Sequence, residues 1–468
     1  MSQFMVSDAV LCSGGKQYGP DIQLCRSWKN DSREVGPGDA FVALKGEKTD
    51  GHNFVHKAVE RGAKLLLVNS DKIEELMLLE PQYAGISILA VPDTEKALAE
   101  IACEYLKVKA PRVIGITGSV GKTTTRELTV SLLQPYKKVH SAIRSFNTVI
   151  GCSLTVLAMP ECTEILILEF GTNHFGEIRD MVALFPPHIA IITEVAPAHL
   201  EGFKNIEGVL NAKMEICDSE KLEMVIYNSD NDLLKDRLSY NYNNIKKIGV
   251  GAKEEGGLKI LDSIVSLSEE GASLLSSYDL NGERFELKTG LFGFQHSYNV
   301  GYAFMAARSF GIEIQEAVET LLKFMPISGR GICKKLPQNQ WVIDEAYNAN
   351  PSSMLAAIDN TIKVAESSGL TAYAILGGMR ELGEASAHWH REILSSLPEF
   401  KKVILLGEEW FDQTVGIPDN AQRHRTFEEI TGLIQTISFP DSVILIKGSN
   451  SYGLKRLVAL LTEGRYVY

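Results

Sequence analysis

Residues 115–127 (GITGSVGKTTTRE) have the residue types needed to hold a phosphate. Backbone N–H groups of a glycine-rich turn that opens a helix point at phosphate oxygens. Lys122 would neutralise the β and γ phosphates, and the Thr123 hydroxyl could bind Mg²⁺. The spacing differs from the usual P-loop, because Ile116 stands where a glycine is expected before Gly121. The stretch therefore predicts a nucleotide site with a shortened loop; the alternative is a strand-to-helix turn without a ligand.

Two further polar side chains follow strand-like apolar runs. Glu169 ends the run EILILEF, and His199 comes shortly after HIAIITEV. The carboxyl ends of neighbouring parallel strands meet at the crevice where doubly wound sheets bind ligands. Glu169 alone is better explained as a solvated charge at a strand end, but the two side chains on neighbouring strand ends favour a Mg²⁺ site. A hard cation prefers oxygen, so the histidine is the less expected ligand.

Two other segments allow both a functional and a structural interpretation. Lys213 lies on a helix-like stripe in NIEGVLNAKMEIC, where periodicity alone favours an exposed lysine. In VIDEAYNANPSSM, Asp344, Tyr347 and Asn348 follow a strand and precede an Asn-Pro turn. A tyrosine there could flank a nucleobase and an aspartate could bind ribose hydroxyls. Ordinary turn chemistry explains the same residues equally well.

The composition is that of a globular protein with several domains. The chain has 468 residues, a net charge of −12 and 45% hydrophobic residues. The acidic balance argues against nucleic acid as a partner. The 7 scattered cysteines contain no C-x-x-C pair, which favours a reducing compartment. Because no secretory signal or membrane-spanning apolar run is present, we expect a cytoplasmic protein without membrane insertion.

Apolar runs and helical stretches alternate in three blocks, 1–95, 96–325 and 326–468. This pattern predicts an α/β protein with parallel sheets covered on both faces. The middle block would hold the phosphate loop in a doubly wound, mainly parallel sheet, and residues 258–291 would add antiparallel hairpins. The third block would form a second, Rossmann-like unit. Its expected strands lie at 341–347, 372–378, 402–408 and 443–449.

Together these motifs resemble those of the Mur ligases. The resemblance rests on GSVGKTT, EFGTNHFGEI, APAHLEGF with NAKMEI, and DEAYNANPSSM. Residues 31–54 and the stretches ILGGMRELGEASAHWHRE and ILIKGSNSYGLKRLV agree with it. The motifs occur in the family's order over nearly the whole chain, and the family's short G-x-x-G-K-T loop explains the spacing at Gly121. A three-domain ligase that uses ATP and Mg²⁺ is implied.

The resemblance also implies roles for individual residues. Lys122, Lys213 and His199 would act in catalysis, and Lys213 matches a lysine that the family carbamylates with CO2. Mg²⁺ would be held by Thr123, Glu169, His199 and Lys213. The implied ATP site consists of Gly118, Ser119, Val120, Gly121, Lys122, Thr123, Thr124, Asn147, Asn299, Arg330, Asp344, Tyr347 and Asn348. The implied uridine-nucleotide side consists of Ser32, Arg33, Lys45, Asp50 and Gly51.

The implied reaction joins D-alanyl-D-alanine to UDP-N-acetylmuramoyl-tripeptide through an acyl phosphate in peptidoglycan precursor synthesis, by a monomeric enzyme. YNANP and HLEGF favour this member over the neighbouring ligase that extends the UDP-N-acetylmuramoyl-dipeptide. The N-terminal block argues against a folate polyglutamyl ligase. A regulatory NTP-binding switch is the alternative from a different class; it would release phosphate without any amine acceptor.

Two stretches depart from the family pattern. In GFQHSYN, Gln295 and His296 stand where the family has histidine and asparagine. In GGMRELGE, Gly378 and Arg380 stand where the family more often has an acidic residue and a small one. The first departure affects the predicted adenine contacts, and the second affects how the dipeptide is held.

Overall fold

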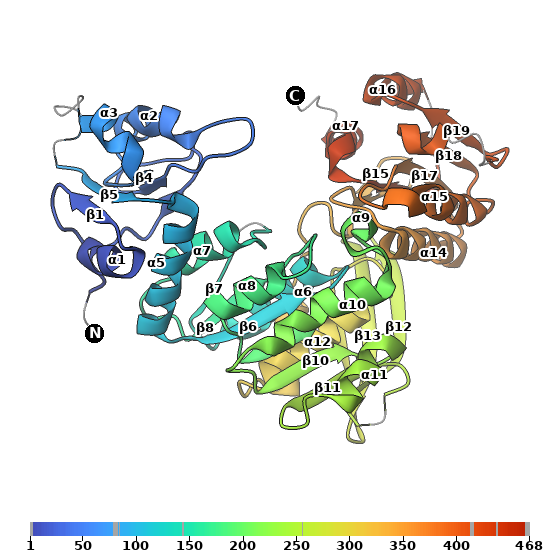
Figure 1. Ribbon diagram of the computed structural model, residues 1–468. Helices are drawn as coiled ribbons and strands as arrows, with labels where there is room; N and C mark the ends of the chain where they lie inside the picture. The colour runs from blue at the N-terminus through green and yellow to red at the C-terminus, as the bar shows by residue number, and fades with distance from the viewer. Residues whose placement is uncertain are drawn as a thin grey trace.

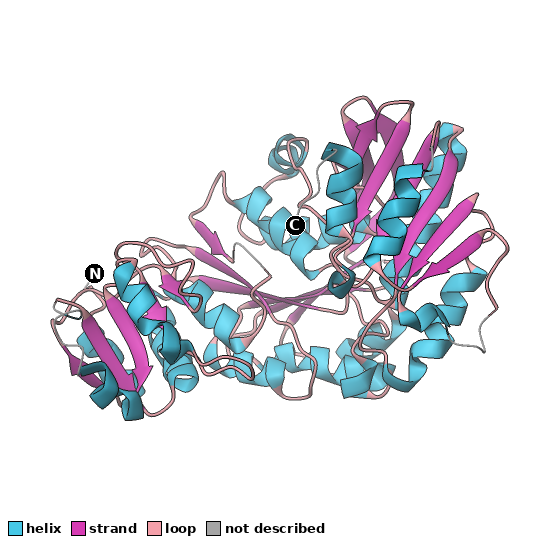
Figure 2. Cartoon of the chain, turned by 90° about the horizontal axis from the view of Figure 1, so that it is seen from above, coloured by secondary structure: helices cyan, strands magenta, loops and turns pink. Residues whose placement is uncertain are grey.

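The computed structural model describes residues 3–77, 83, 85–142, 145–254, 256–411, 416–436 and 439–463. Its strands form three separate sheets of five, nine and six strands. We call the parts around them the first, middle and third lobes, which follow one another along the chain (Figure 1). Viewed from above, the first sheet lies at one end of the molecule and the third at the other (Figure 2).

The first lobe is a small α/β unit. Its strands run in the order β1-β5-β4-β3-β2, with β1 antiparallel to β5 and the other pairs parallel. Apolar side chains of β4 and β5 are buried, as the runs KLLLV and ISILAV predict. The elements are α1 (Val6–Ser13), β1 (Lys16–Tyr18), β2 (Trp28–Lys29), β3 (Ala40–Val42), α2 (Val55–Glu60), β4 (Leu65–Asn69), α3 (Ile73–Met77) and β5 (Ser87–Val91).

Helix α5 (Thr94–Lys109) connects the first and middle lobes. Asp93 caps it by accepting hydrogen bonds from the backbone N–H groups of Glu95 and Lys96. One apolar core includes buried residues of α1, of α5 and of the middle sheet. Because α5 shares this core with both lobes, the predicted boundary at residue 95 stays a prediction.

The middle sheet has the order β14-β13-β12-β11-β10-β9-β6-β8-β7. In this order, all neighbouring strands from β12 through β6 to β7 pair in parallel. Strands β12, β13 and β14 extend the sheet at one edge as antiparallel hairpins. Successive residues of the strands enter different cores: Ile165 and Ile167 lie in one, and Leu166 and Leu168 in the other. Both faces are therefore covered, which explains the unbroken apolar runs.

The strands of this sheet are β6 (Arg112–Thr117), β7 (Val139–Ser141), β8 (Ile165–Glu169), β9 (Ile189–Ile192), β10 (Met224–Asn228), β11 (Lys246–Gly251), β12 (Leu258–Ser268), β13 (Gly271–Leu280) and β14 (Glu283–Thr289). The helices of the lobe are α6 (Lys122–Leu133), α7 (Val149–Leu157), α8 (Glu177–Leu184), α9 (Leu200–Phe203), α10 (Ile206–Met214), α11 (Asp232–Tyr240), α12 (His296–Arg308) and α13 (Ile314–Leu321).

The third lobe contains a sheet with the order β15-β16-β20-β17-β18-β19, in which only β15 pairs antiparallel among the described strands. The four strands expected from sequence are β16, β17, β18 and β20. The elements are β15 (Ile332–Leu336), β16 (Gln340–Glu345), α14 (Pro351–Ser368), β17 (Thr371–Gly377), α15 (Ser386–Ser395), β18 (Lys402–Leu406), β19 (Ala421–His424), α16 (Phe427–Thr436), β20 (Ser442–Lys447) and α17 (Lys455–Glu463).

Candidate active site

A cavity of about 1030 Å³ is lined by residues of the middle and third lobes. The carboxyl ends of β6, β8, β9 and β10 meet there, as expected for a doubly wound sheet. Most of the residues predicted to bind ATP or Mg²⁺ line it. They are Ser119, Val120, Gly121, Lys122, Thr123, Thr124, Asn147, Glu169, His199, Asn299, Arg330, Tyr347 and Asn348.

The phosphate loop joins β6 to α6 through two glycines with positive φ. Gly118 has φ 142° and Gly121 has φ 87°. A Cβ atom at Gly118 would lie 2.0 Å from Thr193 Oγ1, so this position requires glycine. No side chain of the described residues caps the first turn of α6. Its backbone N–H groups are therefore available to an anion.

Lys122 is the first residue of α6 and folds back over the loop. Its Nζ donates a hydrogen bond to the Gly118 carbonyl oxygen at 2.6 Å. Burial lowers the pKa of Lys122 to about 8; the negative charge of Glu169 opposes this effect and the positive charge of Arg330 adds to it. The side chain is thus mainly protonated at neutral pH but close to its titration range.

Glu169 ends β8 and is almost completely buried. Its Oε2 accepts a hydrogen bond from Thr123 Oγ1 at 3.0 Å. Its Oε1 lies 2.9 Å from Arg126 Nη1, and both side chains are 1% exposed. This contact is an ion pair, and among the described residues none donates a hydrogen bond to Oε1. Within the described part of the chain, this oxygen beside the phosphate loop is therefore held by a charge contact alone.

His199 comes from the turn before α9 and has a positive φ of 51°. Its Nδ1 lies 2.5 Å from Oε2 of Glu381, which follows β17 in the third lobe. The close contact with His199 lowers the pKa of the Glu381 carboxyl below its usual value, although burial opposes this effect. This contact connects the middle and third lobes at the cavity wall.

Lys213 lies in the last turn of α10 and is 1% exposed. Periodicity alone favoured an exposed lysine. That expectation is wrong, because the face of α10 that carries Lys213 is also covered by other parts of the protein. Among the described residues, none forms a hydrogen bond or ion pair with Nζ, which lies 5.9 Å from the centre of the Phe203 ring. Burial lowers the pKa of Lys213 well below its usual value, and the charge of Lys122 adds to the effect.

The predicted metal ligands are not gathered into one ready-made cluster. Thr123 contacts Glu169, His199 contacts Glu381, and Lys213 lies outside the cavity lining. Within the described part of the chain, no three histidine, cysteine, aspartate or glutamate side chains converge as a metal site. A cation here would therefore need ligands of other types or a movement of side chains.

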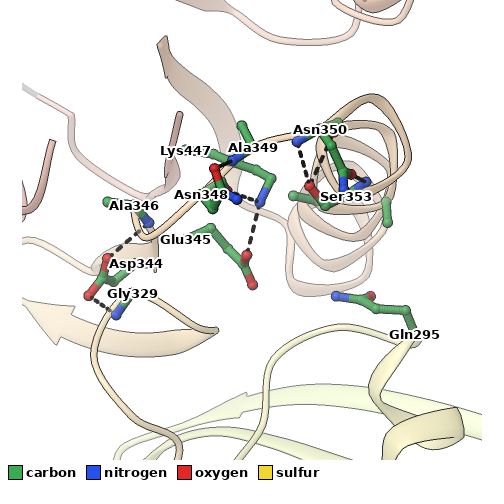
Figure 3. A network of polar contacts seen from close by, with 12 residues as sticks. Gln295, Gly329, Asp344, Glu345, Ala346, Asn348, Ala349, Asn350, Ser353 and Lys447 are labelled. Atoms are coloured by element: carbon green, nitrogen blue, oxygen red, sulfur yellow. Dashed lines mark hydrogen bonds and ion pairs between the residues drawn. The ribbon is translucent and has the colours of Figure 1, made fainter. Parts of the chain in front are cut away.

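The third-lobe residues surround the turn between β16 and α14 (Figure 3). Asp344 is buried and accepts hydrogen bonds from the backbone N–H groups of Gly329 at 2.7 Å and Ala346 at 3.2 Å. Lys447 Nζ contacts Glu345 Oε2 and the carbonyl oxygen of Asn348, both at 3.2 Å. Asp344 stabilises the turn through these hydrogen bonds and is not among the residues that line the cavity.

Tyr347 and Arg330 form a pair on the cavity wall. The Arg330 guanidinium carbon lies 4.1 Å from the centre of the Tyr347 ring, and Lys455 Nζ lies 4.7 Å from it. Arg330 Nη2 also lies 3.5 Å from Ser145 Oγ of the middle lobe. The ring is thus flanked by cations at the junction of the two lobes.

The first departure from the family pattern lies at the start of α12. Burial lowers the pKa of His296 to about 4, and its Nδ1 lies 2.9 Å from Asn299 Nδ2. Gln295 Oε1 accepts a hydrogen bond from Asn360 at 2.6 Å. Asn299 packs against the phosphate loop, because a Cβ at Gly121 would lie 2.5 Å from its Oδ1.

The residues predicted for the uridine nucleotide lie in the first lobe, outside this cavity. Ser32 is buried, and Arg33 is paired with Asp31 at 2.7 Å. The backbones of Lys45 and Asp50 form an isolated antiparallel β-bridge. Gly51 follows Asp50 and packs closely on Leu44, where a Cβ would lie 2.7 Å from the backbone nitrogen.

The structure adds residues to the site that the sequence interpretation missed. Arg126 follows Thr123 by three positions, so helical spacing could have placed both on one face. Glu381 carried no such signal, because its partner His199 is far away in the chain. Glu194 is a partly buried carboxyl that lines the cavity and accepts a hydrogen bond from Asn228 Nδ2 at 2.6 Å. Burial raises the pKa of Glu194.

Comparison with known proteins agrees with this arrangement. The chain matches the Mur ligase family catalytic domain over residues 28–106, the Mur ligase middle domain over 116–307 and the Mur ligase glutamate ligase domain over 331–450. It is 32% identical over 445 residues to the UDP-N-acetylmuramoyl-tripeptide--D-alanyl-D-alanine ligase of Bacillus subtilis. The aligned residues cover 92% of each chain. The chain belongs to the Mur ligase family.

Solved Mur ligase structures share the fold. MurF from Acinetobacter baumannii superposes with a TM-score of 0.81 at 24% identity and covers 99% of both chains. MurF from Thermotoga maritima, solved in complex with ADP, gives a TM-score of 0.78 at 25% identity over 94% of this chain and 98% of that one. The three-domain α/β fold predicted from sequence is confirmed. No described helix of this Mur ligase is both long and apolar enough to cross a membrane.

Proposed function

We propose that this chain is an ATP-dependent amide ligase that joins D-alanyl-D-alanine to UDP-N-acetylmuramoyl-tripeptide. The observation that carries the proposal is the shared cavity, in which an uncapped phosphate loop faces cationic and polar side chains of the third lobe. The name of the Bacillus subtilis relative gives the substrates. The ADP complex of the Thermotoga maritima neighbour supports a nucleotide in such a site.

The phosphates of ATP would bind at the first turn of α6. Backbone N–H groups of this turn and the Lys122 ammonium group provide positive charge there. On binding, Lys122 would exchange its hydrogen bond to the Gly118 carbonyl for phosphate oxygens. The charge of a bound nucleotide would favour the protonated lysine and so raise its depressed pKa.

A carboxylate is a poor electrophile, which explains the need for ATP. An oxygen of the tripeptide's terminal carboxylate attacks the γ-phosphorus, ADP leaves, and an acyl phosphate forms. The dipeptide's amino nitrogen attacks the acyl carbon, the carbon–oxygen bond to phosphate breaks, and the nitrogen loses a proton. Lys122 and Arg330 would offset the negative charge that accumulates when the carboxylate approaches the γ-phosphate.

Residues near the loop fit a Mg²⁺ ion. Thr123, Glu169, His199 and a carbamylated Lys213 would hold it. The fit rests on the chemistry of these donors, because buried Glu169 brings two carboxylate oxygens to the phosphate loop. Its Oε1 is paired with Arg126, so this contact would have to be exchanged for the metal. When bound, Mg²⁺ supplies electrostatic stabilisation of the reacting phosphates. His199 would have to exchange its contact with Glu381 for the metal.

Carbamylation of Lys213 fits the surroundings of its amine. The neutral amine is the form that attacks the carbon of CO2, and burial lowers the pKa of Lys213. After loss of one N–H proton, the product carries a negative charge and two oxygens, which are the ligand type that Mg²⁺ prefers. The absence of a competing ion pair at Nζ among the described residues also favours this modification.

The uridine nucleotide would bind the first lobe, near Ser32, Arg33, Lys45, Asp50 and Gly51. The domains would span residues 1–95, 96–325 and 326–468, and the enzyme would act as a monomer. Its substrates are water-soluble precursors of the cell wall made with ATP, so we place it in the cytoplasm.

The proposal is tested by measuring ADP release with each substrate omitted in turn. A ligase should release ADP in steady state only when the UDP-linked tripeptide and the dipeptide are both present. An ATPase rate that neither organic substrate changes would instead identify an NTP-binding switch. Acceptance of a free diamino acid with the UDP-linked dipeptide would identify the neighbouring ligase.

A further inference from the structure

Glycines at the ends of β17 and β18 make room for one aromatic side chain in the third lobe. A Cβ at Gly407 would lie 2.3 Å from Tyr452 Oη, and a Cβ at Gly377 would lie 3.1 Å from Tyr452 Cδ2. The Tyr452 ring therefore fits against backbone at the carboxyl ends of these strands. This is the edge of the sheet that faces the cavity.

The Glu409 carboxylate occupies the space beside Gly378. A Cβ at Gly378 would lie 2.6 Å from Glu409 Oε2 and 3.0 Å from Tyr452 Oη. Tyr452 also donates a hydrogen bond to Glu409. The lack of a side chain at Gly378 thus leaves room for a carboxylate from the segment after β18. Glu409 is 12% exposed.

This carboxylate holds Arg380. Arg380 Nη1 lies 2.7 Å from Glu409 Oε1, and its guanidinium carbon lies 5.0 Å from the centre of the Tyr452 ring. Among the described residues, no other side chain pairs with Arg380. Its side chain is 53% exposed and lines the cavity. The ion pair and the stacked ring fix the guanidinium group while leaving donors free.

A second arginine, Arg330, lies beside the phosphate loop. Arg330 lies near enough to Lys122 for its charge to lower the pKa of that lysine. Arg330 also contacts Ser145, whose Oγ is 3.4 Å from Thr123 Oγ1. Arg380 instead belongs to the turn that carries Glu381, the partner of His199. The cavity therefore has one arginine beside the phosphate loop and another on the third-lobe wall.

We infer that Arg380 binds the carboxylate of the incoming dipeptide and that Glu409 positions it. This inference rests on the proposed function. The dipeptide has an amino group that must reach the acyl carbon near Lys122 and a carboxylate at its other end. A guanidinium group binds a carboxylate by charge-assisted, often bidentate hydrogen bonds. Arg380 is a specificity residue in this scheme, and Glu409 is a positioning residue.

The test compares D-alanyl-D-alanine with its C-terminal amide, which lacks the negative charge. For the wild type, we expect KM for the amide to be about 10- to 100-fold higher, the scale of a lost charged hydrogen bond. In Arg380→Ala, KM for the acid should rise by the same factor while KM for the amide stays unchanged. Arg380→Met, which keeps an aliphatic stem over Tyr452, gives the same comparison if the alanine variant is unstable.

Glu409→Gln tests the positioning role. It keeps the shape of the side chain but removes the charge that holds Arg380, so the preference for acid over amide should fall by a smaller factor. A purely structural role would lower kcat or stability without changing this preference. Arg425→Ala is the matched control, because Arg425 pairs with Glu408 at 2.8 Å, stacks on Phe411 and is 54% exposed, yet does not line the cavity.

Two results would overturn the inference while the proposed function stands. One is an active wild type that uses acid and amide equally well, and the other is an Arg380→Ala enzyme with an unchanged acid-to-amide ratio. KM for ATP and for the UDP-linked tripeptide should not change in Arg380→Ala. If the wild type releases no ADP in response to both organic substrates, the proposed function itself fails.

Discussion

The Thr123 hydroxyl donates a hydrogen bond to Glu169 Oε2 at 3.0 Å and so joins the first turn of α6 to the end of β8. Glu169 is also paired with Arg126, which lies on the same helix as Thr123. The carboxylate that we propose as a metal ligand is thus part of a buried ion pair. Function and stability are coupled at this residue, and the two effects can be separated by mutation.

Glu169→Gln should lower turnover by about 10²-fold or more through loss of a charge near the reacting phosphates. It should also lower the free energy of unfolding by up to about 3 kcal/mol, because Arg126 loses its buried partner. Glu127 also pairs with Arg126 and limits that loss. Activity and urea-unfolding measurements check the two effects.

The double variant Glu169→Gln with Arg126→Met removes both charges of the pair. We expect it to regain most of the stability but none of the activity. Recovery of turnover together with stability would mean that Glu169 acts only as a structural partner of Arg126.

ATP binding should depend on pH through Lys122. Burial lowers the pKa of its free ammonium group to about 8, so the amine is neutral at higher pH and must take up a proton when ATP binds. The dissociation constant should increase by up to about tenfold per pH unit above 8. Calorimetry in buffers of different ionisation enthalpy measures the proton uptake directly.

Lys122→Arg is the control, because a guanidinium group keeps its proton throughout this range. A wild type whose pH profile matches that of Lys122→Arg would contradict the assignment. Stability should respond with a definite sign as well. Between pH 8 and the usual value of 10.5 the unfolded chain binds more protons, so the destabilisation caused by Lys122 should shrink as pH rises.

Lys122→Ala should reduce turnover by about 10²-fold or more, the scale for losing a transition-state charge contact. Single-turnover measurements at saturating ATP separate this loss from weaker binding. Near-normal turnover in this variant would mean that the loop does not bind the reacting phosphates.

Carbamylation of Lys213 has a spectroscopic test that does not depend on activity. Protein incubated with ¹³C-labelled bicarbonate should give a carbamate carbon signal that is absent from Lys213→Ala. Lys109→Met is the control: Lys109 is a second buried lysine, but it pairs with Glu161 at 3.5 Å, so its removal should leave the signal unchanged. A signal that persists in Lys213→Ala would exclude this site.

Activity should follow the same chemistry. Lys213→Ala should lose most turnover, and added acetate or formate should restore part of it by supplying carboxylate oxygens. Lys213→Arg should stay inactive, since it keeps a positive charge and cannot be carbamylated. An active arginine variant would contradict the carbamate role.

The parts of the fold that were predictable from sequence are those with strong local signals. The buried runs around Leu66, Ile167 and Ile444 became central strands, and the alternating stretch 258–291 became hairpins. Short strands such as β1, β2, β7, β15 and β19 were missed. They lie at sheet edges, where pairing with a neighbour rather than a long apolar run determines the strand.

The same distinction applies to the site. The phosphate loop and Glu169 could be predicted from local sequence because each follows directly from one strand. The burial of Lys213 could not be read from periodicity, because it depends on what covers α10 from other parts of the chain. The contacts of Glu381 with His199 and of Glu409 with Arg380 join segments that are distant in sequence and meet only in the folded protein.

The central claim is most directly tested by following oxygen from the tripeptide carboxylate. The UDP-linked tripeptide would be labelled with oxygen-18 at its terminal carboxylate and incubated with ATP, Mg²⁺ and D-alanyl-D-alanine. Because that carboxylate attacks the γ-phosphate and the acyl carbon–oxygen bond then breaks, one labelled oxygen should appear in each inorganic phosphate released. The amide product should form in equal amount. Release of unlabelled phosphate, as in simple hydrolysis by water, would contradict the proposed ligase.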